Sequence, residues 1–177
     1  MNAALLVIDV QAALFDSNPP PDDGAAVVER INALAERARA ARVPVIYIQH
    51  EREGTPLAHG SPGWSLAPGL QPAEADARVR KSTPDSFLNT RLEPLLQELD
   101  IRHLVICGYA SEFCVDTTTR RALGLGYTVT LAADAHTTHD KPHASGAQIR
   151  AHENATLPDL TSFGPPARAV PAAQIAF

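Results

Sequence analysis

Short apolar segments of strand length alternate with longer segments of helical periodicity along this chain, and this alternation constrains the fold more than any other feature. The first segment, Ala3–Val10, is rich in residues that favour β-structure and carries an acid near its end. Such a run is typical of a central strand that is buried on both faces. Later strands are predicted over Val43–Gln49, Ala77–Lys81, His103–Tyr109, Tyr127–Ala132 and Ala167–Val170.

Helices are predicted between these strands, and the order of the elements indicates the fold class. The predicted helices are Asp22–Arg42, a segment from Thr90 to about Leu99, Ser111–Gly126 and Ala144–Leu157. This order predicts an α/β fold, Rossmann-like, in which an open, mostly parallel six-stranded sheet carries helices on both faces. Residues 1–177 are expected to form a single domain. The loop from His50 to about Ala75 is too long for a plain connection, which indicates a functional segment or a lid.

The charge and the cysteine content narrow the class of function. The net charge of −5 argues against nucleic acid or an anionic membrane as a partner, because both favour a basic surface. Only Cys107 and Cys114 are present, so a disulfide scaffold is not expected and a cytoplasmic location is predicted. Asp9 interrupts the N-terminal apolar run, so we expect neither a signal peptide nor a membrane span there.

Three residues that can perform chemistry lie at one end of the predicted sheet. Asp9 is near the end of the first strand, Lys81 ends the third, and Cys114 lies in the first turn of the helix after the fourth. In an open α/β sheet, ligands bind beyond the carboxyl ends of the strands. These residues are far apart in sequence, and their convergence on that edge predicts a site.

Together the three side chains suit nucleophilic catalysis. A cysteine is a strong nucleophile as the thiolate, which the helix N-terminus and the Lys81 cation would favour. Asp9 can take the thiol proton and return it to a leaving nitrogen. Each residue also has a plainer interpretation: Asp9 as a strand terminator, Lys81 as a surface lysine and Cys114 as a small buried side chain. Cys107 is interpreted as core packing.

Three segments resemble the isochorismatase-like cysteine hydrolases, namely LLVIDVQ, RKSTPDSF and GYASEFCVDTTTRRALGLGY. They come in the family's order and spacing, and the resemblance runs from about Ala4 to Leu160. It implies an Asp9–Lys81–Cys114 triad, a thioester intermediate, and an oxyanion hole built from the backbone N–H groups of Ala110 and Cys114. It also implies a cis peptide between Tyr109 and Ala110, a six-stranded parallel sheet, and assembly as a homodimer or homotetramer.

The nucleophilic cysteine favours one reaction within that family. Enzymes that hydrolyse the isochorismate vinyl ether resemble the family but generally lack this cysteine, so we expect cleavage of a C–N bond in a small amide or ureido substrate. Two alternatives stay open: a vinyl-ether hydrolase that does not need Cys114 as nucleophile, and a non-catalytic scaffold or redox-sensing protein. Binding of a dinucleotide is disfavoured, because the turn after the first strand has no glycine.

No cofactor and no catalytic metal are expected. Nicotinamidases of this family carry a metal site built from an Asp-x-His after the second strand, and here that segment reads Gln49-His50-Glu51. A divalent site from His50, Glu51 and the later His59 is a weak alternative. A second group of histidines is interpreted as surface or substrate-side residues: His136, His139 and His143.

Six residues are candidates for contact with the substrate: Gln11, Phe15, Trp64, Phe87, Tyr109 and Phe113. The three phenylalanines would give an apolar lining, although each is equally suited to the core. Trp64, the only tryptophan, is expected near the pocket, at a subunit interface, or as an anchor of the long loop. Gln11 is expected to bond to substrate or to the loop backbone. Glu112 would oppose thiolate formation, so we expect it to point outward or to an adjacent subunit.

Overall fold

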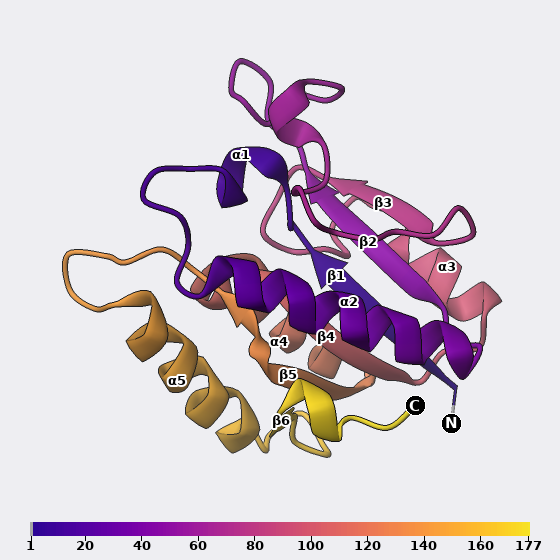
Figure 1. The fold of residues 1–177 in the computed structure, drawn as a ribbon. Helices are drawn as coiled ribbons and strands as arrows, with labels where there is room; N and C mark the ends of the chain where they lie inside the picture. The colour runs from indigo at the N-terminus through magenta and orange to yellow at the C-terminus, as the bar shows by residue number, and fades with distance from the viewer. Residues whose placement is uncertain (1) are drawn as a thin grey trace.

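Six parallel strands form one open sheet in the order β3-β2-β1-β4-β5-β6 in a computed structural model, which describes residues 2–177. The chain runs outward from the centre in one direction and then in the other, so the two halves of the sheet meet where β1 pairs with β4 (Figure 1). The strands are β1 (Ala3–Ile8), β2 (Val45–His50), β3 (Ala77–Lys81), β4 (His103–Tyr109), β5 (Thr128–Thr137) and β6 (Arg168–Val170).

Helices cover both faces of this sheet (Figure 1). The helices are α1 (Ala12–Phe15), α2 (Gly24–Ala40), α3 (Leu92–Glu98), α4 (Asp116–Gly124) and α5 (Gly146–Thr156). Short 3-10 turns, η1 (Pro62–Trp64), η3 (Leu157–Asp159) and η4 (Ala172–Gln174), lie in the connections, and a π-helical turn, η2 (Ser111–Val115), precedes α4. None of the helices in residues 2–177 has the length and apolar character needed to cross a bilayer.

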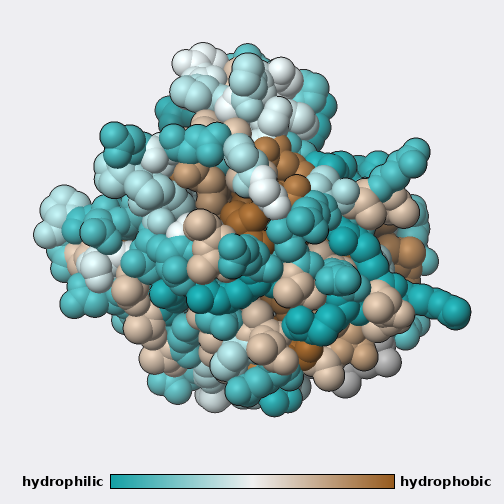
Figure 2. All heavy atoms as spheres, viewed as in Figure 1, coloured by the Kyte–Doolittle hydropathy of each residue, from teal (hydrophilic) through white to brown (hydrophobic). Residues whose placement is uncertain are grey.

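Alternate side chains of β1 enter two separate hydrophobic cores. Leu5 and Val7 pack with α2 on one face, whereas Leu6 and Ile8 pack with α3 and α4 on the other. All six residues of β1 are buried, as expected for a central parallel strand. The outer side of α2 is hydrophilic, and hydrophobic residues are visible in the hollow between α2 and the loops beside it (Figure 2). The cores therefore hold the sheet rigid beneath its carboxyl edge.

The sequence predicted the six strands and the four main helices, and the structure confirms the α/β class with a fully parallel sheet. Two elements differ from the expectation. The strand expected to end at Ala132 continues to Thr137, because after a register shift it pairs with Gly108 and Tyr109. The helix expected over 111–126 begins instead with the π-helical turn η2. The single-domain organisation stays a prediction.

Gly108 lets β4 lie against β1 at the start of the site. Its φ is +120°, and a Cβ atom there would lie 2.1 Å from the Ile8 carbonyl oxygen. A side chain would therefore force apart the two central strands of the sheet. Gly126 also has a positive φ of +88°, but no atom lies within 4 Å of the position that its Cβ would take.

We predict that Gly108→Ala lowers the free energy of unfolding by more than about 4 kcal/mol, because both backbone strain and a backbone clash oppose it. Gly126→Ala is the matched control and should cost only about 1–2 kcal/mol, the strain of a left-handed residue. Urea unfolding followed by circular dichroism measures both. Equal costs for the two variants would contradict the role of Gly108.

Candidate active site

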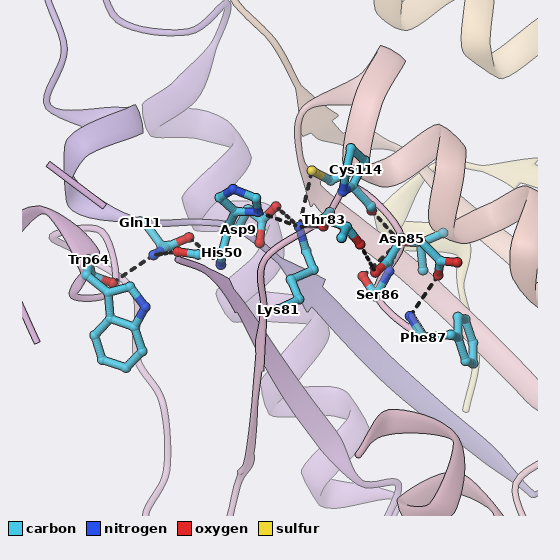
Figure 3. Close-up of polar contacts among 12 residues, drawn as sticks. Asp9, Gln11, His50, Trp64, Lys81, Thr83, Asp85, Ser86, Phe87 and Cys114 are labelled. Atoms are coloured by element: carbon cyan, nitrogen blue, oxygen red, sulfur yellow. Dashed lines mark hydrogen bonds and ion pairs between the residues drawn. The ribbon is translucent and has the colours of Figure 1, made fainter. Parts of the chain in front are cut away.

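Asp9, Lys81 and Cys114 come together at the carboxyl edge of the sheet, as the sequence predicted (Figure 3). Asp9 directly follows β1, Lys81 is the last residue of β3, and Cys114 lies in η2 after β4. The Lys81 Nζ atom is 2.6 Å from Asp9 Oδ2 and 3.2 Å from Cys114 Sγ. The ammonium group therefore joins a carboxylate and a thiol that the sequence separates by more than one hundred positions.

The Lys81 ammonium group is buried and fully engaged. Its side chain has no exposed surface, and besides Asp9 and Cys114 it donates to the Thr83 carbonyl oxygen at 3.1 Å. His50 Nδ1 lies 3.4 Å away, and burial together with the Lys81 charge lowers the pKa of His50. A buried charge is costly unless it is paired and hydrogen-bonded, so this arrangement is a strong indication of function.

The backbone of Asp9 leaves the sheet in an unusual conformation. Its φ is +52°, in the left-handed region, which Asp tolerates better than most residues. The Asp9 N–H still donates to the Ile48 carbonyl oxygen at 2.8 Å. One carboxylate oxygen bonds to Lys81, while the other, Oδ1, is buried without a hydrogen-bond partner. That free oxygen is available to accept a proton.

Burial and two neighbouring charges act on the pKa of the Cys114 thiol. Burial raises its pKa to about 12, the negative charge of Asp9 adds to this, and the Lys81 cation only partly opposes it. Lys81 lowers the pKa of the thiol, in the direction that the sequence predicted, but desolvation and Asp9 outweigh it. At neutral pH the resting group is a thiol with a base beside it.

The segment before Cys114 has the backbone that the resemblance implied. The peptide between Tyr109 and Ala110 is cis, and η2 begins immediately afterwards. The first N–H groups of a helix have no acceptor within the helix, so those of Ala110 and the η2 turn are candidates to bind an anion. Ser111 Oγ lies 2.8 Å from His136 Nδ1, which anchors this turn to β5.

His136 is a buried structural residue, and its interpretation as a surface or substrate-side histidine was wrong. It is fully buried, and its Nε2 atom lies 3.0 Å from Asn154 Oδ1. Burial lowers the pKa of His136 to about 4, so the ring is neutral. The Asn154 amide donates in turn to the Ala133 carbonyl oxygen, so Nε2 carries the proton and Nδ1 accepts from Ser111. Nothing in the sequence pattern indicated this pairing.

Half-buried aromatic side chains border the cis peptide. The rings of Phe15 and Tyr109 lie edge to face, 6.0 Å apart. The Tyr109 hydroxyl group lies 2.8 Å from His139 Nδ1, and His139 Nε2 lies 2.7 Å from Ser17 Oγ. His139 thus links the loop after α1 to the end of β4. Phe113 is exposed, with the Lys141 ammonium group 5.3 Å from its ring centre.

Three of the six residues expected to contact the substrate have roles in the fold, namely Phe87, Gln11 and Trp64. Phe87 is buried in the core beside Tyr127, on the side of Ser86 away from Lys81 (Figure 3). Gln11 is fully buried and bonds to the backbone of His50 in both directions, and to the Trp64 carbonyl oxygen. Of the two roles expected for Gln11, the structure shows contact with the loop backbone.

Trp64 anchors the long loop, which was one of its three expected roles. Its carbonyl oxygen accepts from both Gln11 and Gln49, and its indole ring lies against His59 with the ring centres 4.7 Å apart. The indole lies well to the side of the Lys81 ammonium group (Figure 3). It borders an open cavity of about 870 Å³ whose lining includes Arg78 but none of the three central side chains.

Glu112 points away from the Cys114 thiol, as expected, but it does not extend freely into solvent. Its Oε1 atom accepts from Thr138 Oγ1 at 2.9 Å and pairs with Lys141 Nζ at 3.2 Å. Its Oε2 atom is buried without a hydrogen-bond partner. The Lys141 cation offsets the negative charge that Glu112 places near η2.

The weak alternative of a divalent metal site gains no support. His50 faces Lys81, Glu51 forms a two-point ion pair with Arg80, and His59 packs on the Trp64 ring. Within residues 2–177, no three His, Cys, Asp or Glu side chains are arranged to hold a metal ion.

Comparisons with known proteins identify the family to which the chain belongs. Residues 3–159 match the model of the isochorismatase domain. The chain is similar to a structure described as an isochorismatase from Pseudomonas putida, with 32% identity and a TM-score of 0.88 over 98% of this chain and 90% of that one. It is also similar to a cysteine hydrolase from Pseudomonas syringae, with 26% identity and a TM-score of 0.87 over 97% and 89%.

Two relatives have named reactions. The chain is 39% identical to a streptothricin hydrolase from Streptomyces noursei over 80% of its own length and 51% of the relative's. It is 30% identical to a ureidoacrylate amidohydrolase from Caulobacter segnis over 90% of its length and 79% of that protein's. The match spans about half of the streptothricin hydrolases, 51% and 57% of two such sequences.

We predict opposite effects of Asp9 and Lys81 on the reactivity of the Cys114 thiol. Asp9→Asn removes a negative charge that raises the pKa of Cys114, so the thiolate fraction at pH 8 and the rate of alkylation by iodoacetamide should rise about tenfold or more. Lys81→Met removes the opposing cation and should slow the reaction. Mass spectrometry follows both cysteines separately.

Cys107 is the internal control, because it is fully buried and burial raises its pKa strongly. It should stay unmodified in every variant that circular dichroism shows to be folded. Faster alkylation of Cys114 in Lys81→Met, or slower alkylation in Asp9→Asn, would contradict the electrostatic description of the site.

Proposed function

Because this chain belongs to the isochorismatase family, we propose that it is a cysteine-dependent hydrolase of a C–N bond in a small amide or ureido compound. The observation that carries the proposal is the Asp9–Lys81–Cys114 contact, in which a buried ammonium group lies within hydrogen-bond distance of both a carboxylate and a thiol. Three features support it: the free oxygen of Asp9, the helical turn that carries Cys114, and relatives named as hydrolases and amidohydrolases.

The first half of the reaction forms a thioester. Asp9 Oδ1 accepts the thiol proton while Cys114 Sγ attacks the carbonyl carbon, so the S–C bond forms as the carbonyl π electrons move to oxygen. The N–H groups of Ala110 and Cys114 bind that oxyanion. When the tetrahedral species collapses, the C–N bond breaks and the proton on Asp9 passes to the leaving nitrogen.

The second half restores the enzyme. A water molecule gives one proton to Asp9 and attacks the thioester carbon, and a second oxyanion forms in the same place. Collapse breaks the C–S bond and returns the proton to Cys114 Sγ, which leaves a carboxylic or carbamic acid as product. Lys81 stabilises the sulfur anion each time it forms, because its ammonium group lies 3.2 Å from Sγ.

Because the pKa of the Cys114 thiol is raised, the nucleophile needs a base to activate it. A thiol whose pKa burial raises to about 12 is a poor nucleophile until a base removes its proton, and Asp9 supplies that base inside the site. A resting thiol of this kind also resists adventitious oxidation, because oxidants react with the thiolate. A homodimer or homotetramer stays a prediction.

We predict that Cys114→Ala abolishes release of ammonia from a panel of small carboxamides and ureido compounds, with a loss of at least about 1,000-fold in kcat/KM. Asp9→Asn should show a comparable loss although its thiol alkylates faster, because the base is missing. Cys107→Ala is the matched control and should keep its turnover, since that thiol is buried in the core.

The alternatives give different outcomes in the same assay. Substantial turnover in Cys114→Ala would favour a hydrolase that does not use the thiol, such as one acting on a vinyl ether. If turnover is the same in Asp9→Asn and in Lys81→Met as in the parent protein, the proposed triad as a whole is contradicted.

A further inference from the structure

The last two residues of β5 and the two that follow them form a layer of polar side chains behind the turn η2. This segment, 136–139, reads His-Thr-Thr-His, and its first three residues are fully buried. It lies there because β5 continues past its register shift and pairs with Gly108 and Tyr109. Among the described residues, none of its side chains bonds to the proposed triad, so the triad does not explain these buried polar groups.

A chain of hydrogen bonds runs from the start of η2 through this segment to α5. Ser111 Oγ lies 2.8 Å from His136 Nδ1, and His136 Nε2 lies 3.0 Å from Asn154 Oδ1. The Asn154 amide donates to the Ala133 carbonyl oxygen at 2.9 Å, which fixes which way the amide faces. All the donors therefore point in one direction, from Ser111 to His136 and from His136 to Asn154. The buried Ser111 hydroxyl group is thus held in one orientation.

Two further bonds hold the rest of the turn to the same segment. Glu112 Oε1 accepts from Thr138 Oγ1 at 2.9 Å, and the Tyr109 hydroxyl group lies 2.8 Å from His139 Nδ1. Side chains on both sides of Ala110 are therefore bonded to the end of β5 or to the residues that follow it. Because these bonds are separate, loss of one of them is expected to loosen the turn without unfolding it.

Ala110 lies between these fixed side chains, and its N–H group is free. The residue is 1% exposed, and its N–H group forms no hydrogen bond to any of residues 2–177. Its carbonyl oxygen accepts from the N–H groups of Phe113 and Val115, each at 3.1 Å, and Cys114 lies between these two residues. A buried backbone N–H without an acceptor is rare in native proteins, so this group is available to a substrate oxygen.

We propose that His136, acting through Ser111, positions the Ala110 N–H group to bind the oxyanion. The inference rests on the proposed function, because it concerns the oxygen on which attack by Cys114 places a charge. Ser111 directly follows Ala110, so the bond from its hydroxyl group to His136 fixes one end of the residue that carries this donor. His136 is fully buried and acts through the turn, which makes it a positioning residue.

The neutral ring suits this role. Burial lowers the pKa of His136 to about 4, with the Asn154 bond and Asp134 opposing the effect and Arg150 adding to it. Near neutral pH the Nδ1 atom is therefore unprotonated and accepts from Ser111. Because no member of the chain of bonds is charged, the donors alone stabilise the oxyanion, and a shift of one such donor costs much of the rate.

Two reactions of Cys114 separate the position of this donor from the reactivity of the thiol. Alkylation by iodoacetamide attacks a methylene carbon and places no charge on a carbonyl oxygen. Addition to acetaldehyde forms an S–C bond and passes the thiol proton to the carbonyl oxygen, which then lies where the oxyanion would. Acetaldehyde labelled with carbon-13 at its carbonyl carbon shows this adduct by NMR, and Cys114→Ala identifies its signal. This probe needs no amide substrate.

Ser111→Ala and His136→Phe should each weaken the acetaldehyde adduct at least about tenfold. On any amide that the parent protein cleaves, kcat should fall about 100-fold while KM stays within about threefold. Alkylation of Cys114 should stay within about twofold, because the ion pair beside the thiol is untouched. The double variant should lose no more than the weaker single variant, because both changes remove the same bond. His152→Phe makes the same change at an exposed position on α5 and should alter none of these.

Ser111→Ala removes one hydroxyl group and is expected to fold, so the test does not depend on the stability of His136→Phe, which thermal unfolding checks. The inference is overturned if folded Ser111→Ala binds acetaldehyde as the parent protein does, if adduct formation and alkylation fall by the same factor, or if the parent protein forms no adduct. An adduct that is weakened in Ser111→Ala, in a parent protein that cleaves no amide, would support the positioning role and contradict the proposed hydrolysis.

Discussion

The buried ammonium group of Lys81 is the interaction on which the arrangement of the site depends. It is held at once by the Asp9 carboxylate, the Cys114 thiol and the Thr83 carbonyl oxygen. Removing one partner from a buried ion pair leaves an uncompensated charge and typically costs about 3–5 kcal/mol. The turn after β1, the end of β3 and the turn η2 are therefore tied to a single atom, and none of them can shift without affecting the other two.

The sheet brings these segments together at its topological switch point. Strand order reverses between β1 and β4, and open α/β sheets bind ligands beyond the carboxyl ends of the strands at such a point. Asp9 follows one of these strands and η2 follows the other. Gly108 allows the close approach, since any side chain there would collide with Ile8. Burial of the thiol raises its pKa, so the proposed chemistry needs the adjoining base.

The turn η2 separates two regions of different electrostatic character. On one side Cys114 faces a lysine and an aspartate that pair with each other. On the other side Glu112 and the nearby Glu153 each keep a buried oxygen without a partner. The turn itself is held by the neutral His136 through Ser111, so its position does not depend on a charge. The turn thus carries Cys114 on one side and borders a cavity of about 330 Å³ on the other.

The sequence by itself determined the α/β class, the parallel six-stranded sheet and the convergence of Asp9, Lys81 and Cys114. Those features follow from hydrophobic periodicity and from the rule that carboxyl ends of parallel strands share an edge, both of which are local or topological. The tertiary structure alone decided the surroundings of the Cys114 thiol, the burial of Phe87 and His136, and the partners of Gln11 and Glu112. These properties depend on desolvation and on contacts between residues remote in the chain, such as His50 with Lys81. A one-dimensional pattern carries no information on either, because both arise only when the packed chain excludes water.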